Sequence, residues 1–421
     1  MTTYFDINLD LTDEDKAIRE EAHKFARDVI RPAGREMDRM TAKEAISENS
    51  PLHDVMRQAY ELGYHKAGFP EEVGGLGCTP LQTHLMWEEL YWGSLGLAAC
   101  ISLSGWPFVK IMGTGNQELI DEFVVPYCNC DDGSISGCWA ITEPDHGSDT
   151  MNAGEKFFTD PKIRGQLQAR LDGDEYVLSG QKSSWVSCGP FATHGMVNVA
   201  IDPSQGMAGG GVCILPLTLP GVSRGAPLEK VGQRDLPQGE LFFDNVRIPR
   251  RWMFYTPENY IESGVLGNLG FGNTFMSIVA LGLARAAFDE GYDWAKGRVQ
   301  GGKPLAEHYS MKIRIHGMFS RVEAIRALSR AVWDVNLRAS SILPEYGFAA
   351  KTFCTDTARE VVEEAVQIYS ANGLTKEYHI EKIWRDSRAL TIEDGENNTL
   401  SRIGGHVLNE CFPRADVDKL F

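Results

Sequence analysis

The chain has 421 residues, of which 43% are hydrophobic and 24% are charged, so it can form two or three folded domains. Its formal net charge of −17 argues against a general affinity for nucleic acids or anionic membrane surfaces. The nine cysteines are irregularly spaced and do not predict a disulfide framework. Cys128 and Cys130 lack a second pair of ligands nearby, so we expect no metal site.

The start of the chain, Met1-Thr-Thr-Tyr-Phe-Asp, has no basic region and no apolar core, so we expect no secretory signal. We also expect no membrane span, because no stretch combines the necessary length and apolarity. These features predict a soluble, cytoplasmic protein with reduced thiols.

Apolar residues at helical spacing predict helices over 11–34, 52–62, 81–98 and 117–125. Thr12 and Asp15 have the spacing that caps a helix start, and Pro32 is expected to end the first helix. The glycine-rich segment 70–77 lacks the lysine of a phosphate-binding loop and is interpreted as a connector. Residues 1–133 are therefore predicted to form a helical domain.

The pattern changes to short alternating runs over 137–141, 168–171, 176–178, 195–200, 212–216 and 240–246. Turn residues separate these runs, which predicts a small β-barrel or sandwich over 134–250. Residues 153–167 are expected to form a surface loop on this β-domain, with no role assigned. Helical spacing then returns over 278–299, 311–341, 348–373 and 401–411, which predicts a helical bundle over 251–421.

Two polar segments stand out within the predicted β-domain. Residues 139–150 read W-A-I-T-E-P-D-H-G-S-D-T, a strand that runs into a turn able to offer backbone N–H groups and hydroxyls to a heterocycle or a phosphate. An ordinary turn is the alternative. Residues 180–187 read G-Q-K-S-S-W-V-S and again alternate a tryptophan with hydroxyls.

Together the two segments resemble the acyl-CoA dehydrogenase family, whose patterns are close to (Y/W)-x-(I/V/L)-T-E-P-x-A-G-S-D and G-x-K-x-W-I-(T/S)-N. The closing segment 232–249 is similar to the family's G-x-R-x-S…F-x-x-V-x-V-P, although Asp235-Leu-Pro stands where Gly-Ser is frequent. The resemblance covers nearly the whole chain. It implies an α+β fold with an N-terminal helical domain, a middle β-barrel domain and a C-terminal four-helix bundle.

The family removes an α-proton and a β-hydride from an acyl-CoA thioester, and it commonly carries its base in the motif I-Y-E-G-T. The matching stretch, 390–399, reads L-T-I-E-D-G-E-N-N-T, which aligns Asp394 with the base and Glu393 with the aromatic residue. Aspartate is one methylene shorter than glutamate and suits a branched or cyclic acyl group. Glu393 is the rival base. Some members carry the base on another helix, where this chain has Gly272.

The resemblance also implies a set of FAD-binding residues. The residues expected near the flavin and along the cofactor are Trp139, Ile141, Thr142, Gly147, Ser148, Trp185, Ser187, Arg298, Gln367, Ala371, Glu396 and Asn398. Ser148 and Gly395 are expected to contact substrate, and Asn273 replaces the usual arginine near the CoA site. Core packing is the alternative for Trp185. An acidic helix-capping cluster before Ser401 is the alternative for Asp394 and fits Glu396 better. Ser370 and Ala371 replace a glycine pair.

The implied partners are an acyl-CoA substrate and an electron-transferring flavoprotein, and Arg298 implies a homotetramer through a neighbouring subunit's FAD. A flavin-dependent monooxygenase on the same fold and a flavin-binding subunit without turnover are the alternatives. The pocket region 101–107 contains no arginine for a distal carboxylate. Trp92 and Trp106 suggest either an aromatic-lined pocket or core packing.

Overall fold

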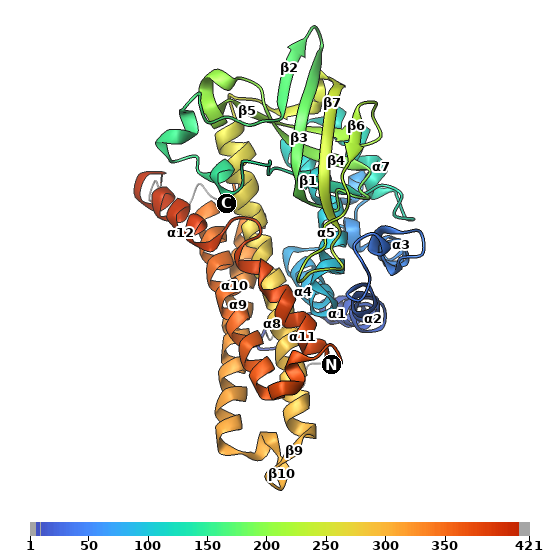
Figure 1. Cartoon of the computed structure of the whole chain (residues 1–421), viewed down its shortest axis with the longest axis vertical. Coiled ribbons are helices and arrows are strands. Elements are labelled where there is room, and N and C mark those ends of the chain that lie inside the picture. The colour runs from blue at the N-terminus through green and yellow to red at the C-terminus, as the bar shows by residue number, and fades with distance from the viewer. Residues whose placement is uncertain (1–5, 9, 412–421) are drawn as a thin grey trace.

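The computed structural model describes residues 6–8 and 10–411 and contains a helical part, a sheet and a long helical bundle (Figure 1). Met1–Phe5, on which the prediction of no secretory signal depends, lie outside the described residues. The first part comprises α1 (Asp13–Phe25), the wide turn η1 (Ala26–Ile30), α2 (Arg31–Met37), α3 (Pro51–Glu61), α4 (Pro80–Gly93), α5 (Leu95–Thr114), α6 (Gln117–Leu119), η5 (Ile120–Val124) and α7 (Val125–Cys128).

The start of α1 is the predicted capping box, with Thr12 and Asp15 each accepting the other's backbone N–H. The predicted end at Pro32 is wrong, because the helical run continues to Met37. A five-residue turn with i→i+5 hydrogen bonds precedes the proline, and such a π-bulge tolerates the missing proline N–H. The predicted helix 81–98 is in fact two helices, which meet at the extended residue Ser94.

The middle part forms one eight-stranded sheet. Seven strands follow the order β6-β7-β3-β2-β4-β5-β8, and β1 pairs in parallel with β4. The strands are β1 (Gly137–Ala140), β2 (Gln168–Asp172), β3 (Glu175–Ser187), β4 (His194–Ala200), β5 (Gly210–Pro216), β6 (Val222–Arg224), β7 (Gln238–Pro249) and β8 (Met253–Tyr255). All six predicted strands are present, and the short edge strands β6 and β8 were missed.

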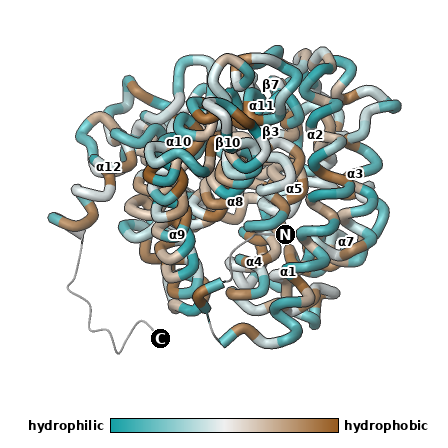
Figure 2. The backbone as a smooth tube through the Cα atoms, turned by 90° about the horizontal axis from the view of Figure 1, so that it is seen from below, coloured by the Kyte–Doolittle hydropathy of each residue, from teal (hydrophilic) through white to brown (hydrophobic). Residues whose placement is uncertain are grey.

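The third part surrounds one long helix, α8 (Asn268–Gly297), which follows the wide turn η10 (Tyr260–Gly267). Figure 1 shows α8 running from the sheet to the small hairpin at the other end of the bundle, and Figure 2 shows it between α5, α9 and α10. The remaining elements are β9 (Val299–Gln300), β10 (Lys303–Pro304), α9 (Tyr309–Arg338), α10 (Pro344–Tyr369), α11 (His379–Ser387), α12 (Asn397–His406) and η14 (Val407–Cys411).

Two helical stretches are long and apolar enough to cross a membrane, so the expectation that no such stretch exists is wrong. They are Leu95–Thr114 and Tyr260–Gly297, and 72% and 83% of their most apolar windows are buried inside the fold. A helix that is apolar on all sides is also what the centre of a large folded core requires.

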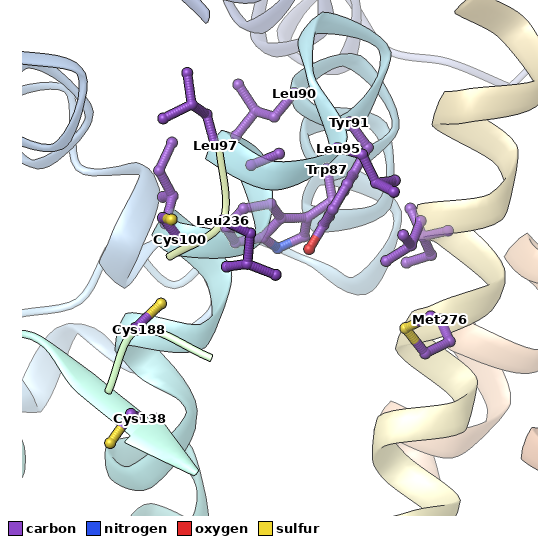
Figure 3. Packing of buried hydrophobic residues seen from close by; sticks show 14 of the residues in the cluster. Trp87, Leu90, Tyr91, Leu95, Leu97, Cys100, Cys138, Cys188, Leu236 and Met276 are labelled. Carbon is purple, nitrogen blue, oxygen red and sulfur yellow. The ribbon is translucent and has the colours of Figure 1, made fainter. Parts of the chain in front are cut away.

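The three parts are joined by buried contacts. Figure 3 shows Leu236 from the closing segment against α5, the helix that carries Leu97 and Cys100, with Cys188 and Cys138 following along the junction. The carboxylate of Asp235 accepts a hydrogen bond of 2.5 Å from Ser94 Oγ and forms an ion pair of 2.9 Å with Lys382 Nζ. Asp235 thus connects the helical part, the sheet and α11, which accounts for an acid at this position.

The segment between β1 and β2 is not only a surface loop, as predicted. It contains the short helical turns η6 (Ser148–Met151) and η7 (Lys156–Thr159), and Phe158 is fully buried in an apolar cluster that includes Ile403. Glu155 forms an ion pair with Arg402 on α12. The segment therefore ties the sheet to the last helices of the chain.

Candidate active site

The end of β1 is fixed by a buried ion pair that the sequence analysis did not identify. Lys182 Nζ lies 2.7 Å from Glu143 Oε1 and donates a hydrogen bond of 3.1 Å to the carbonyl of Ile141. Glu143 also accepts the backbone N–H groups of Gln166 and Leu167. Because the carboxylate has several donors and the amine has two acceptors, the pair can be buried without an unsatisfied charge. It sets the backbone on which Ile141 and Thr142 lie.

The hydroxyls of the two motifs meet at this point. Thr142 Oγ1 lies 2.6 Å from Ser183 Oγ, and the Ser183 N–H donates to the Thr142 carbonyl at 2.9 Å. Trp139 Nε1 donates to Asn198 Oδ1 at 2.9 Å, which fixes the indole at the neighbouring strand β4. The structure therefore brings the predicted residues Trp139, Ile141 and Thr142 together with the second motif.

Trp185 lies on an irregular part of β3. Two residues, Ser183 and Ser184, stand where the family motif has one, and the pairing with β7 shifts register between Lys182 and Val186. The Trp185 side chain is 60% exposed, so the alternative of core packing is wrong. Ser187 Oγ accepts a hydrogen bond of 3.0 Å from Gln238 Nε2. An exposed aromatic face at such an irregularity can stack against a planar ligand.

The predicted base loop is fixed through its backbone. Asp394 has a φ of 52° and Gly395 a φ of 108°, and aspartate is among the few non-glycine residues that tolerate the left-handed region. The Asp394 carbonyl accepts a hydrogen bond of 3.1 Å from Asn273 Nδ2 on α8. The Gly395 carbonyl accepts one of 2.6 Å from the buried Lys351 Nζ on α10. Two helices thus position the loop from behind.

The two neighbouring acids of this loop have different environments. Both carboxylate oxygens of Glu393 accept from Gln233 Nε2, at 3.1 and 3.0 Å. Burial and the neighbouring Asp394 raise the pKa of Glu393 to about 7. The Asp394 carboxylate accepts no hydrogen bond within the described part of the chain, and burial raises its pKa although Lys351 opposes the shift. Asp394 is therefore the acid that is free to act on a ligand.

Asn273 stands where the family resemblance places an arginine near the CoA site, and here it holds the backbone in place. Its side chain is fully buried and bonds to the Leu269 and Asp394 carbonyls. The preceding residue, Gly272, faces the indole of Trp106: a Cβ at Gly272 would lie 3.4 Å from two ring carbons. Trp106 in turn stacks on Trp139, with 5.9 Å between ring centroids, so it borders the site.

Trp92, the other candidate pocket residue, belongs to the structural core. Its Nε1 donates a hydrogen bond of 2.8 Å to Asp289, and the Arg31 guanidinium lies 3.7 Å from its ring centroid. These contacts join α4 to α8, and the indole is buried in the main apolar cluster.

Three of the predicted cofactor residues lie at the other end of the bundle. Arg298 follows α8, with its guanidinium 5.9 Å from the Trp294 ring, and Trp294 stacks on Tyr369 at 4.5 Å. This arrangement brings Arg298 near the end of α10, where Gln367 and Ala371 are exposed. Figure 1 shows this end far from the sheet that carries Trp185, so one copy of the chain does not unite the two groups.

The remaining predicted residues lie at two helix starts. Glu396 caps α12, accepting the Thr399 N–H at 3.0 Å and the Asn398 side chain at 2.9 Å. The capping alternative for Glu396 is thus confirmed, and its contact with the cofactor stays a prediction. Gly147 and Ser148 lie near the end of the first motif and begin the helical turn η6, where the Gly147 carbonyl accepts a hydrogen bond of 2.7 Å from the Thr150 hydroxyl.

Family models for the acyl-CoA dehydrogenase N-terminal, middle and C-terminal domains match residues 12–131, 138–246 and 264–408. The chain is 28% identical to the probable acyl-CoA dehydrogenase YngJ of Bacillus subtilis, over 92% of this chain and 96% of the relative. It is 27% identical to the benzylmalonyl-CoA dehydrogenase of Aromatoleum aromaticum, over 94% and 98% of the two chains. It is also 27% identical to the cyclohex-1-ene-1-carbonyl-CoA dehydrogenase of Syntrophus aciditrophicus, over 95% and 91%.

Among solved structures, butyryl-CoA dehydrogenase from Megasphaera elsdenii superposes with a TM-score of 0.84 at 27% identity, covering 96% of this chain and all of that one. A chain in a structure described as the electron transferring flavoprotein of Acidaminococcus fermentans also gives a TM-score of 0.84, at 26% identity and with the same coverage. The protein belongs to the acyl-CoA dehydrogenase family and is an FAD-dependent oxidoreductase that acts on the CH–CH group of CoA thioesters.

Proposed function

We propose that the protein dehydrogenates a bulky, branched or cyclic acyl-CoA, with Asp394 removing the α-proton. The observation that carries this proposal is the contrast within the base loop. Gln233 donates hydrogen bonds to the Glu393 carboxylate, whereas the Asp394 carboxylate has no hydrogen-bond partner within the described residues. A raised pKa makes Asp394 a stronger base than an ordinary aspartate. A stronger base is better matched to the weakly acidic C–H group from which it removes the proton.

The shorter side chain supports the choice of acyl group. Aspartate places its carboxylate about one C–C bond farther from the substrate than glutamate would, and proton abstraction requires close approach. A ring or branch next to the α-carbon can fill this space. Two relatives are named for acyl-CoA substrates that carry a ring, benzylmalonyl-CoA and cyclohex-1-ene-1-carbonyl-CoA. Their names support a ring-bearing or branched acyl group as the substrate class.

The residues around Trp185 fit a flavin. The exposed indole offers a stacking face, and Thr142 and Ser187 offer hydroxyls beside it. Bound FAD supplies an acceptor for the β-hydride. Trp139, Ile141 and Thr142 would hold one side of the ring and Trp185 the other, and Ser148 and Gly395 would contact the thioester. The electrons would pass to an electron-transferring flavoprotein, which the structural neighbour so described supports.

We also propose that the protein is a homotetramer. Arg298, Gln367 and Ala371 lie too far along the bundle to reach a flavin beside Trp185 of the same copy, so a second copy would supply them. Arginine suits this role because its planar fork pairs with phosphate oxygens. Light scattering gives the mass in solution. Arg298→Ala should weaken FAD retention, and Lys296→Ala, two residues earlier and also exposed, serves as the control.

The test of the reaction is an anaerobic titration of the flavin-loaded protein with straight-chain, branched, cyclic and aryl-substituted thioesters. Loss of flavin absorbance by the bulky class supports the proposal. Asp394→Asn should keep FAD and lose bleaching, whereas Glu393→Gln should keep both. Bleaching that survives Asp394→Asn and disappears in Glu393→Gln would make Glu393 the base. No bleaching by any thioester, together with oxygen consumption by the reduced protein, would support the monooxygenase alternative.

A further inference from the structure

Two buried hydrogen-bond donors lie side by side on α5 without an acceptor. The side chains of Trp106 and Lys110 are 7% and 8% exposed. Among the described residues, Trp106 Nε1 has no hydrogen-bond partner, and none forms a hydrogen bond or an ion pair with Lys110 Nζ. The ammonium group instead lies 4.5 Å from the ring centroid of Phe271 and 4.9 Å from that of Trp106.

Such a lysine is costly to bury. Cation–π contact recovers part of the hydration that the ammonium loses, but it supplies no hydrogen-bond acceptor. Burial accordingly lowers the pKa of Lys110 to about 7, and no carboxylate contributes an opposing shift. By contrast, the buried Lys182, Lys351 and Lys382 each bond to a carbonyl or carboxylate oxygen. Lys110 is therefore the exception among these four buried lysines, with a missing oxygen partner.

The two donors lie next to the candidate active site. The Trp106 indole stacks on Trp139, the first residue of the motif beside the flavin position. The same indole lies 3.4 Å from the point where a Cβ would stand on Gly272. The next residue on α8, Asn273, bonds to the carbonyl of Asp394. One turn of α8 thus has the donor pair on one side and the proposed base on the other.

We propose that Lys110 and Trp106 Nε1 form a subsite for a carboxylate on the acyl part of the substrate. An ammonium and an indole N–H can each donate to a carboxylate oxygen, which satisfies both orphan donors and neutralises the buried charge. This inference rests on the proposed function and narrows its substrate to a bulky acyl-CoA that carries a second acid group. Residues 101–107 contain no arginine for a distal carboxylate, but Lys110 lies one helical turn later.

The chemistry required is an anionic oxygen, and the CoA moiety could also provide one. Binding measurements on non-reacting thioethers of CoA separate the two sources. One series ends in a carboxylate, HOOC-(CH2)n-S-CoA, and the other ends in a methyl group. We expect at least one carboxylate length to bind about 10-fold more tightly than its methyl counterpart, as judged by calorimetry with the FAD-loaded protein. Such a ratio corresponds to about 1.4 kcal/mol.

Lys110→Met should remove the preference for the carboxylate and leave binding of the methyl series unchanged. Trp106→Phe removes the N–H donor together with part of the indole and should reduce the preference for the carboxylate. Lys43→Met, an exposed lysine of the helical part, is the matched control and should keep it. Flavin absorbance and thermal melting verify that each variant is folded and loaded.

Two results would overturn the subsite. One is equal binding of the carboxylate and methyl series at every length. The other is a loss of affinity in Lys110→Met for both series and for CoA alone, which would assign the donors to the CoA moiety. Both results are compatible with bleaching by neutral bulky thioesters, so they leave the proposed function intact. Failure of every thioester to bleach the flavin would instead refute the proposed function.

Discussion

The side chain of Asn273 donates a hydrogen bond of 3.1 Å to the backbone carbonyl of Asp394. The bond runs from the central helix α8 to the residue proposed as the base, and it acts on the backbone, so it leaves the carboxylate free. Lys351 bonds to the next carbonyl, that of Gly395. The two hydrogen bonds together hold a loop in which Asp394 and Gly395 have left-handed backbone angles.

Asn273→Ala should lower kcat about 10-fold with little change in KM. Loss of the bond lets the carboxylate leave its position, and misplacement of a reacting group by about 1 Å can cost up to 100-fold in rate. Rapid-mixing measurements of flavin reduction report the chemical step directly. Asn336→Ala removes another buried asparagine that bonds to α8 and is the control, since Asn336 bonds to Thr274 and does not contact the base loop. Equal losses in both variants would show a general effect on packing.

Removal of the Lys351 charge should move the acidic limb of the rate profile to higher pH. Burial raises the pKa of Asp394, and the Lys351 ammonium lowers it. The base must be ionised, so kcat/KM rises with pH through its pKa. Lys351→Met removes the opposing effect, and the rise should occur at higher pH. A profile between pH 5 and 9 tests this, and an unchanged limb would exclude electrostatic coupling of the two residues.

Glu393→Gln should stabilise the protein above neutral pH. The pKa of Glu393 is raised to about 7, so between pH 4.5 and 7 the folded state binds more protons than the unfolded state and stability falls as pH rises. The glutamine variant lacks this loss. Its melting temperature should exceed that of the wild type at pH 8, and the difference should disappear at pH 4.5.

Lys110→Met should also raise the melting temperature, with the opposite dependence on pH. The lowered pKa of about 7, against an ordinary 10.5, means that the unfolded state binds more protons between these values, so wild-type stability rises with pH across this window. The advantage of the methionine variant is therefore largest at pH 7 and below and shrinks towards pH 10. A difference that stays constant from pH 6.5 to 9.5 would contradict the absence of a partner for this ammonium.

Ser370→Gly should stabilise the protein by about 1 kcal/mol, in the range typical of relieved backbone strain. Ser370 has a φ of 55° and a ψ of −140°, a conformation that favours glycine, and it stands where the sequence predicts a departure from a glycine pair. Denaturant unfolding measures the gain. Ala371→Gly, the neighbouring substitution at a residue without a positive φ, is expected to destabilise.

The sequence predicted most elements of the fold because the spacing of apolar residues is a local property. It placed the capping box of Thr12 correctly, but it misjudged Pro32, since the wide turn that tolerates the proline is visible only in backbone bonding. The prediction of one helix over 81–98 failed because Ser94, the extended residue between α4 and α5, carries no strong breaking signal.

The candidate site was predictable only where a linear motif carries it. Trp139, Thr142, Trp185 and Asp394 were identified in this way. The partners of these residues come from distant segments: Lys351 and Asn273 hold the base loop from two helices, and Gln233 occupies Glu393 from the segment that closes the sheet. Lys110 belongs to no sequence motif. Its lack of a hydrogen-bond partner among the described residues is evident only from the packing of the helices.

The buried thiols at the junction of the helical part and the sheet provide a chemical probe of the separation of these two parts. Burial raises the pKa of Cys138 to about 12 and that of Cys188 well above its ordinary value, so neither forms a reactive thiolate at neutral pH while the junction is closed. Modification of Cys138 and Cys188 by a thiol reagent therefore requires the closing segment around Leu236 to move away from Cys100. The labelling rate would report how frequently the junction opens, and a ligand seated across it should slow that rate.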